Sequence, residues 1–257
     1  MSNINRVEGG RKGRAEGYNT EDQIKPILNN NKAVCATILA LKFKQKYVTA
    51  SEYKNITIKK LKDKRAADLV IYYKSIYAGV DSKKSDGASA TQWMRKRISG
   101  FLEEADSNEK KIFERYFLYK TDSESKFLKD ETGKSIREQF NFNTSDEDFF
   151  FNYINNKKEL MIKKRWDNNP ETWCDFLILY KNKIFKLVEI NDLLNLEITR
   201  EKMKLKRTNY VFGKYITFKP YGASSPDLQF TINKSVFDSN YSYHINLSGK
   251  ILKDKSI

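Results

Sequence analysis

Three charged residues, Asp68, Asp81 and Lys83, flank or follow an apolar segment and could together act on a phosphate ester. The segment is rich in β-branched and aromatic residues, and the polar pair Lys74-Ser75 lies at its centre, a pattern typical of a β-hairpin with a two-residue turn. The strands of such a hairpin are antiparallel, so Asp68 is expected opposite Asp81, with Cβ atoms about 5 Å apart. Lys83 shares their face, because side chains two residues apart on a strand point the same way.

Two carboxylates this close repel each other, and a divalent cation between them relieves the repulsion. Oxygen ligands suit Mg²⁺, and the backbone carbonyl of Ser82 can supply another one. Such a cation lowers the pKa of water and neutralises charge on a phosphodiester, while Lys83 can position the attacking water or polarise the phosphate. The pattern therefore indicates phosphodiester hydrolysis. It is short, and it also fits solvent-exposed aspartates at strand ends beside a surface lysine.

The opposite face of the predicted hairpin is apolar and can be buried against helices. Its residues are Leu69, Ile71, Ala78 and Val80. One register thus gives the hairpin a buried face and a charged face.

The elements around the hairpin predict an α/β protein with a mixed central sheet flanked by helices. One helix is predicted to begin near Asn19 or Thr20. Further helices are predicted over Ala33–Leu41, Ala88–Ala105, Glu109–Tyr119 and Asp146–Ile154, and Ser145 is expected to cap the last of them. Ser51–Leu61 fits either a helix or a strand. Predicted strands in the second half are Leu160–Lys164, Trp173–Tyr180, Ile184–Ile190, Val211–Lys219, Leu228–Asn233 and Tyr243–Leu247.

The charge of the chain points to a polyanionic partner. Its 257 residues include 48 Lys and Arg against 33 Asp and Glu, a formal net charge of +15. Such a field attracts nucleic acid, although a generally Lys- and Asn-rich composition is the alternative explanation. The two cysteines, Cys35 and Cys174, lie far apart in apolar runs, and His244 is the single histidine. A zinc site is therefore not expected, and any metal must be held by carboxylates.

Residues 1–16 are basic and glycine-containing, which predicts a flexible arm, and residues 17–257 show no long linker and are expected to form a single domain. The sequence has no apolar stretch long enough to span a bilayer and no hydrophobic signal core at its start. A cytoplasmic protein without membrane contact is expected.

Two segments in the second half are candidates for DNA contact. Within Lys202–Lys219 there are basic residues and no acidic ones, and Lys204, Lys206 and Arg207 are the candidates there for phosphate contacts. Lys219, Tyr221 and Gln229 flank a loop that contains Pro, Gly and Ser and could project into the major groove.

The motif of Asp68, the hairpin and Asp81-Ser-Lys83 resembles the catalytic motif of the PD-(D/E)XK nuclease superfamily. More specifically, the chain is similar to the small type II restriction endonucleases that cut GCGC or CCGG tetranucleotides. Three further segments carry this resemblance in the same order along the chain: Gly17-Tyr-Asn-Thr-Glu21-Asp-Gln-Ile24, Trp173-Cys-Asp-Phe-Leu-Ile-Leu-Tyr-Lys181, and Phe212–Gly222 with Leu228–Asn233. Ala67 replaces the usual proline before the first aspartate, and the hairpin is shorter than in those enzymes.

The resemblance implies a restriction-endonuclease-like core with a C-terminal β-hairpin region. It also implies a catalytic role for Glu21, DNA contacts by Gln92 and Arg95, and a bacterial cytoplasmic enzyme that cuts a short GC-containing palindrome. A two-fold palindrome is most simply cut by two copies of one chain, so a homodimer on double-stranded DNA is expected. Two alternatives stay open: a repair or junction-specific nuclease of the same superfamily, and a non-catalytic basic DNA-binding protein.

Overall fold

The computed structural model describes residues 22–61, 67–83, 89–97, 106–108, 131, 143–163, 173–206, 209–221 and 227–254. The chain divides into two compact units. The first comprises Met1–Thr91, Ile162–Leu194 and Asn233–Ile257, and the second comprises Gln92–Met161 and Asn195–Ile232. The predicted arm over 1–16 lies outside the described residues, and the single domain over 17–257 stays a prediction.

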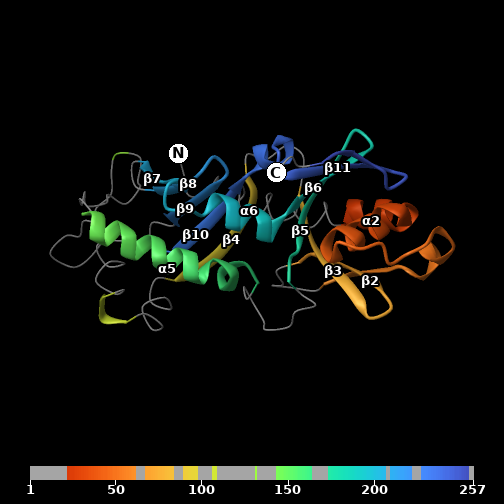
Figure 1. Cartoon of the computed structure of the whole chain (residues 1–257), viewed down its shortest axis with the longest axis horizontal. Coiled ribbons are helices and arrows are strands. Elements are labelled where there is room, and N and C mark those ends of the chain that lie inside the picture. The colour runs from red at the N-terminus through yellow and green to blue at the C-terminus, as the bar shows by residue number, and fades with distance from the viewer. Residues whose placement is uncertain are drawn as a thin grey trace. The chain divides into compact units, whose positions relative to one another are not determined.

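The first unit contains a seven-stranded mixed sheet with the order β1-β2-β3-β5-β6-β11-β12 (Figure 1). The strands are β1 (Thr57–Lys60), β2 (Leu69–Tyr73), β3 (Ile76–Lys83), β5 (Phe176–Lys181), β6 (Ile184–Glu189), β11 (Ser242–Asn246) and β12 (Ile251–Lys253). Neighbouring strands are antiparallel, except that β3 and β5 are parallel. Helical segments of this unit are residues 22–30, α2 (Lys32–Phe43), η1 (Ala50–Asn55) and η3 (Lys234–Asp238), and α6 (Ile190–Glu197) follows β6. The prediction of a mixed α/β fold is confirmed.

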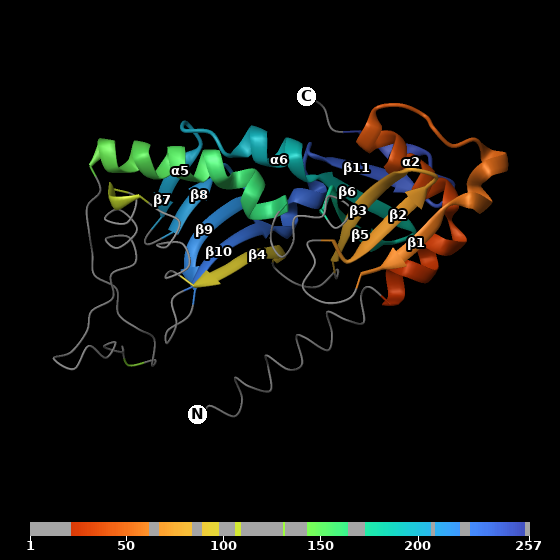
Figure 2. The ribbon, with the colours of Figure 1, turned by 90° about the horizontal axis from the view of Figure 1, so that it is seen from below.

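The second unit is built on a five-stranded sheet with the order β4-β10-β9-β8-β7 (Figure 2). Its strands are β4 (Ser89–Arg97), β7 (Met203–Lys206), β8 (Asn209–Phe212), β9 (Ile216–Tyr221) and β10 (Asp227–Asn233), and α5 (Thr144–Lys163) is its long helix. Phe150 of α5 stacks on Tyr210 with ring centroids 4.4 Å apart and meets Phe218 edge-on at 5.6 Å. These contacts pack α5 against β8 and β9.

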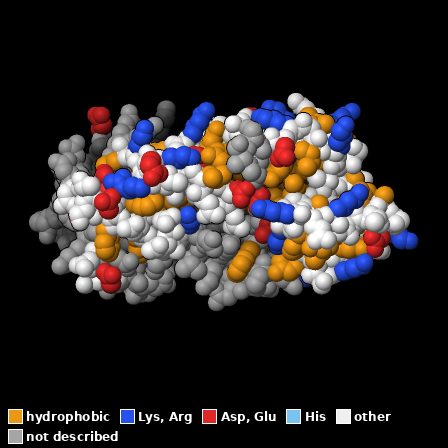
Figure 3. All heavy atoms as spheres, in the orientation of Figure 1, with side chains coloured by type: hydrophobic (Ala, Val, Ile, Leu, Met, Phe, Trp, Pro, Cys, Tyr) orange, Lys and Arg blue, Asp and Glu red, His pale blue; other side chains and the backbone are white. Residues whose placement is uncertain are grey.

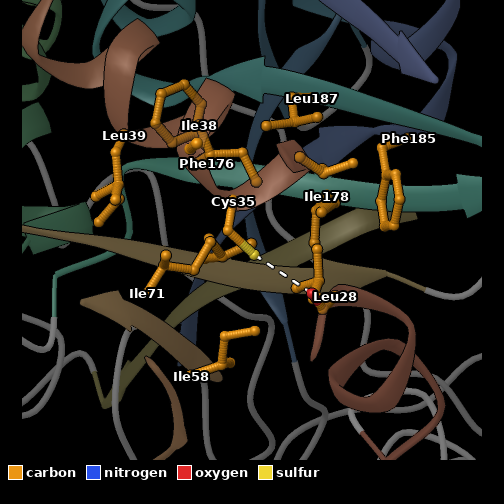
Figure 4. Packing of buried hydrophobic residues seen from close by; sticks show 14 of the residues in the cluster. Leu28, Cys35, Ile38, Leu39, Ile58, Ile71, Phe176, Ile178, Phe185 and Leu187 are labelled. Atoms are coloured by element: carbon orange, nitrogen blue, oxygen red, sulfur yellow. Dashed lines mark hydrogen bonds between the residues drawn. The ribbon is translucent and has the colours of Figure 1, made fainter. Parts of the chain in front are cut away.

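The main core of the first unit lies between α2 and one face of the seven-stranded sheet (Figure 4). On α2, Val34, Cys35, Ile38 and Leu39 are buried. The facing strand residues include Leu69, Ile71, Ala78, Val80, Phe176, Ile178, Phe185 and Leu187. Burial of one such aliphatic or aromatic side chain contributes about 1.5–3 kcal/mol, so this layer anchors the hairpin. The apolar hairpin face predicted from the sequence is confirmed.

The predicted register of the β2–β3 hairpin is also confirmed. Leu69 pairs with Val80 and Tyr73 with Ile76, which leaves Lys74 and Ser75 as the turn. Lys74 has φ of 52°, a left-handed conformation that tight hairpin turns require. The turn therefore determines which residues of the two strands face each other.

Three predicted elements differ in the structure. Residues 89–97 of the predicted helix Ala88–Ala105 form strand β4, because pairing with the distant β10 supplies their main-chain partners. The predicted strand Leu160–Lys164 overlaps the end of α5, since a short apolar run fits either period and can extend an existing helix. The predicted strand Val211–Lys219 is interrupted at Gly213, where the chain turns from β8 to β9.

Caps and turns around the second sheet also come from residues that the sequence did not single out. Asn143, not Ser145, caps α5: its Oδ1 accepts a hydrogen bond from the Asp146 N–H at 2.9 Å. At the β8–β9 turn, the buried Glu197 carboxylate accepts hydrogen bonds from the Lys214 N–H at 2.9 Å and from Lys202 Nζ at 3.0 Å.

Among the described helices, none has the length and apolar character needed to cross a bilayer.

A close main-chain approach at Gly79 joins the hairpin to β5. A Cβ atom at Gly79 would lie 1.7 Å from the carbonyl oxygen of Trp173. Beside it, Asp175 accepts hydrogen bonds through Oδ2 from the Gly79 N–H at 2.8 Å and from Lys42 Nζ at 2.9 Å, and its own N–H donates to the Gly79 carbonyl at 2.8 Å. Only glycine leaves room for this approach.

Gly79→Ala is therefore expected to destabilise the protein by about 3 kcal/mol or more, at or above the upper end of the usual range for overpacking. The clash is with backbone, which cannot rotate away as a side chain does. Urea denaturation monitored by circular dichroism measures the change. An unfolding midpoint equal to that of the wild type would show that the approach of Trp173 is not required.

Candidate active site

Asp68 and Asp81 lie together on the face of the hairpin opposite the α2 core. Asp68 immediately precedes β2, and its N–H donates to the Val80 carbonyl at 3.0 Å, which continues the hairpin pairing by one residue. Asp81 lies near the end of β3 and is only 3% exposed. Strand alternation thus places both carboxylates on the side away from Val80 and Leu69.

Ser82 orients the carboxylate of Asp68. Oδ2 of Asp68 accepts hydrogen bonds from the Ser82 N–H at 2.8 Å and from Ser82 Oγ at 3.1 Å. A carboxylate fixed by two donors is pre-oriented for a further ligand, because its rotation is already restricted. The sequence had assigned Ser82 only a carbonyl ligand, so its N–H and hydroxyl add a second contribution.

Lys83 contacts the second carboxylate directly. Its Nζ donates a hydrogen bond to Asp81 Oδ1, and the two groups form an ion pair. The Lys83 side chain is 21% exposed and that of Asp81 is 5% exposed, so the ammonium lies at the edge of the buried Asp81 carboxylate. The structure thus brings Asp68, Asp81, Ser82 and Lys83 together, as the sequence predicted.

The electrostatics of this group favour an added positive charge. Burial raises the pKa of Asp81 well above its usual range, the charge of Asp68 raises it further, and Lys83 acts in the opposite direction. Burial lowers the pKa of Lys83, but the charges of Asp81 and Asp68 outweigh this and raise it overall. The Lys83 ammonium therefore interacts with both adjacent carboxylates.

The donor set fits a hard divalent cation better than a transition metal. Asp68 and Asp81 offer carboxylate oxygens, and the Ser82 carbonyl is a main-chain oxygen beside them. In the described part of the chain, no three residues of the His, Cys, Asp and Glu types gather into a metal-binding group. A cation here would depend on two carboxylates completed by main-chain oxygen, water or substrate, the incomplete protein coordination that Mg²⁺ usually keeps.

Two neighbours of the site were not assigned a role from the sequence. Asp175 ties the start of β5 to Gly79, two residues before Asp81, and so holds the parallel pairing in which Asp81 lies opposite Leu177. Cys174 is a buried thiol whose pKa burial raises well above its usual value, which keeps it protonated beside the site. The signal available in the sequence was their place in Trp173-Cys-Asp, directly before a predicted strand.

The remaining predicted residues belong to the second unit or lie outside the description. Glu21 and Arg207 are outside the described residues. The backbone positions of the others are on the five-stranded sheet: Gln92 and Arg95 on β4, Lys204 and Lys206 on β7, Lys219 and Tyr221 on β9, and Gln229 on β10. Lys219 pairs directly with Gln229, and Tyr221 with Asp227, so β9 and β10 form the expected C-terminal hairpin.

One basic residue of the run Lys202–Lys219 has an acidic partner that the sequence did not indicate. Lys202 Nζ binds Glu197 Oε1 at 3.0 Å and also donates to the Leu196 carbonyl. Lys204, by contrast, is exposed on β7. The run itself contains no acidic residue, but Glu197 of α6 lies close enough to pair with Lys202. The sequence of the run alone therefore did not show which of its cations are paired.

No protein-family model and no curated protein matches this sequence. The geometry of Asp68, Asp81, Ser82 and Lys83 is therefore the basis for inferring a function.

A double-mutant cycle tests the orientation of Asp68. Because Ser82 Oγ binds Asp68, the unfolding free energies of Asp68→Ala and Ser82→Ala are expected to be non-additive by at least about 0.5 kcal/mol. Denaturant unfolding of the metal-free protein supplies the four free energies. The control pairs Asp68→Ala with Ser248→Ala, in the β11–β12 turn, which should be additive within about 0.5 kcal/mol. Additivity in both pairs would mean that the Ser82 hydroxyl does not hold Asp68.

Proposed function

We propose that the chain is a Mg²⁺-dependent endonuclease that hydrolyses phosphodiester bonds in double-stranded DNA. The observation that carries this proposal is the placement of Asp68, Asp81 and Lys83 on one face at one end of the β2–β3 hairpin. The hydrogen bond from Lys83 to Asp81 and those from Ser82 to Asp68 support it. The net charge of +15 supports a polyanionic substrate.

Each residue of the site has a separate task in this proposal. Asp68, Asp81 and the Ser82 carbonyl would hold Mg²⁺. When bound, Mg²⁺ lowers the pKa of water and neutralises negative charge that develops on the phosphate. Lys83 lies within reach of Asp81, and its ammonium orients the attacking water or stabilises a phosphate oxygen. Ser82 keeps Asp68 in the orientation that the ligand set needs.

The more specific proposal is a type II restriction endonuclease of the PD-(D/E)XK superfamily. The resemblance of the catalytic motif supports it, as does a sheet in which the catalytic strand β3 has a parallel neighbour, β5, and a helix, α2, covers the opposite face. On this proposal Glu21 is a further catalytic residue, a homodimer cuts a short GC-containing palindrome, and the enzyme acts in the bacterial cytoplasm. A restriction-endonuclease-like core belongs to the same proposal.

The DNA contacts are proposed to divide between phosphate and base recognition. Lys204, Lys206 and Arg207 would bind phosphates, whereas Lys219, Tyr221 and Gln229, with Gln92 and Arg95, would lie near base edges. On the face of the molecule that Figure 3 draws, basic side chains are spread out with acidic ones among them. Charge of both signs is therefore mixed over the described part of that face.

Replacing either carboxylate is expected to abolish cleavage. Asp68→Asn and Asp81→Asn remove a metal ligand and should lower the cleavage rate by orders of magnitude while DNA binding persists. Lys83→Ala should also lose cleavage, and because Lys83 pairs with the buried Asp81 it should lower the melting temperature, so cleavage is assayed well below that temperature. The assay is incubation of each purified variant with a sequenced plasmid and Mg²⁺, with mapping of the ends, and Asp254→Asn, an exposed carboxylate, is the control.

The products of the wild type separate the alternative functions. Discrete fragments with common ends support a restriction enzyme, whereas cuts at junctions or mismatches indicate a repair nuclease. No Mg²⁺-dependent cleavage by the wild type would leave a non-catalytic DNA-binding protein. Full activity in either aspartate variant would rule out this site.

Substitutions of the proposed phosphate contacts and of the proposed base contacts are expected to have different effects on DNA binding. Lys204→Ala and Lys206→Ala should weaken binding to all DNA sequences alike. They should also reduce the salt slope, which is the change in the logarithm of the binding constant with the logarithm of the salt concentration, by about one for each lost phosphate contact. Lys219→Ala or Gln229→Ala should instead narrow the gap between target and random DNA, by about 1–3 kcal/mol for a bidentate base contact. Binding across a salt series measures both. If Lys219→Ala and Gln229→Ala lower the affinity for target and random DNA equally, the β9–β10 hairpin binds the DNA backbone and does not read the sequence.

A further inference from the structure

A second cluster of cations surrounds a cavity of about 420 Å³ in the first unit. Its lining includes Lys181 of β5, Lys186 of β6, and Lys234 and Ser235 of η3. Two ammonium groups of the lining, those of Lys181 and Lys186, stand against one carboxylate, that of Asp238, whereas Lys234 Nζ is itself buried. Lys186 forms an ion pair with Asp238, so that carboxylate balances a single ammonium. The lining as a whole therefore carries excess positive charge and suits an anion.

The neutral groups of the cavity also suit phosphate oxygens. Ser235 brings a hydroxyl donor, and the Asn233 side chain accepts from the Ser235 N–H at 2.9 Å through Oδ1, which leaves its amide N–H groups as donors. The apolar part of the lining consists of Leu179 and Phe237. Such a lining recognises a charged group and has little flat apolar surface for a base.

The cavity lies on the same face of the sheet as the candidate active site. In the parallel pairing of β3 and β5, Lys83 lies opposite Leu179, and in the antiparallel pairing of β5 and β6, Leu179 lies opposite Lys186. Directly opposed residues share a face, so Lys83, Leu179 and Lys186 form one row across three strands. Neighbouring strands are about 4.8 Å apart, which places the β6 end of the row about 10 Å from the strand of Lys83.

This separation suits a DNA backbone that crosses both sites. One DNA strand presents a phosphate every 3.4 Å along the helix axis, so a phosphate at the cavity would lie within about three nucleotides of the phosphate at Lys83. Lys181, Ser235 and Asp238 are exposed, so the cavity opens to solvent and can admit a group that remains attached to a polymer.

We propose that this cavity binds a backbone phosphate of the DNA strand that is cut, a few nucleotides from the scissile phosphate. The inference rests on the proposed function, since its ligand is the substrate of the nuclease. The cavity anchors and orients the strand, whereas Asp68, Asp81 and Lys83 act on the bond. Contacts of this kind determine register and carry no sequence information.

The test compares Lys181→Gln and Ser235→Ala with Lys46→Gln, which removes an exposed cation from the segment after α2. Binding to a random-sequence duplex is measured by fluorescence anisotropy in EDTA between 50 and 200 mM salt, and melting temperatures check folding. Lys181→Gln is expected to weaken binding about tenfold and to reduce the salt slope by about one. Ser235→Ala should weaken binding without changing the slope, and Lys46→Gln should change neither.

A titration with inorganic phosphate and thymidine monophosphate, followed by ³¹P NMR, distinguishes the sources of the phosphate. If Lys181→Gln loses these small ligands but keeps its duplex affinity, the cavity serves a free phosphate compound and the DNA assignment is wrong. If it changes neither, the cavity is not a phosphate site. Plasmid cleavage by the wild type separates this result from the proposed function. Wild-type cleavage together with unaltered duplex binding by Lys181→Gln overturns the cavity assignment alone. Weakened duplex binding without wild-type cleavage overturns the nuclease and leaves the cavity as a site for a DNA phosphate that is not part of a cut strand.

Discussion

The structure of the first unit depends on a hairpin that buries apolar side chains on one face and holds two carboxylates, of which Asp81 is buried, on the other. Leu69 and Val80 pack under α2, and the same alternation turns Asp68 and Asp81 to the opposite side. A register shift of one residue would exchange the two faces and would put the carboxylates into the apolar core, at a cost of several kcal/mol. The core that stabilises the fold thus also holds the charged group in place.

This arrangement leaves the protein with an electrostatic strain at the site. Asp81 is buried beside a second carboxylate, and the charge of Lys83 opposes their repulsion. Burial of like charges opposes folding unless a cation is added. Such local opposition between stability and charge placement is characteristic of functional sites, where a group is kept ready for a ligand at the expense of the free protein.

The parallel pairing of β3 with β5 connects the hairpin that carries the charged group to the rest of the sheet. Gly79 and Asp175 hold the start of that pairing, and from there Lys83, Leu179 and Lys186 continue in one row. Rigid strands are better supports for a reactive group than loops, since neighbours on both sides restrain them. The same row connects the candidate active site with the basic cavity.

The sequence by itself determined the hairpin, its turn at Lys74, its register and the gathering of Asp68, Asp81 and Lys83, because those relations depend on alternation and on a turn within one short segment. Tertiary structure decided whatever needed a partner distant in sequence. Residues 89–97 became a strand because β10 pairs with them, and Leu160 continued a helix because α5 already existed. Glu197 of α6 forms an ion pair with Lys202, and η3, from a separate part of the chain, lines a cavity together with Lys186. Periodicity reports the preferences of a segment, whereas hydrogen bonds and charges between remote segments depend on how the chain returns on itself.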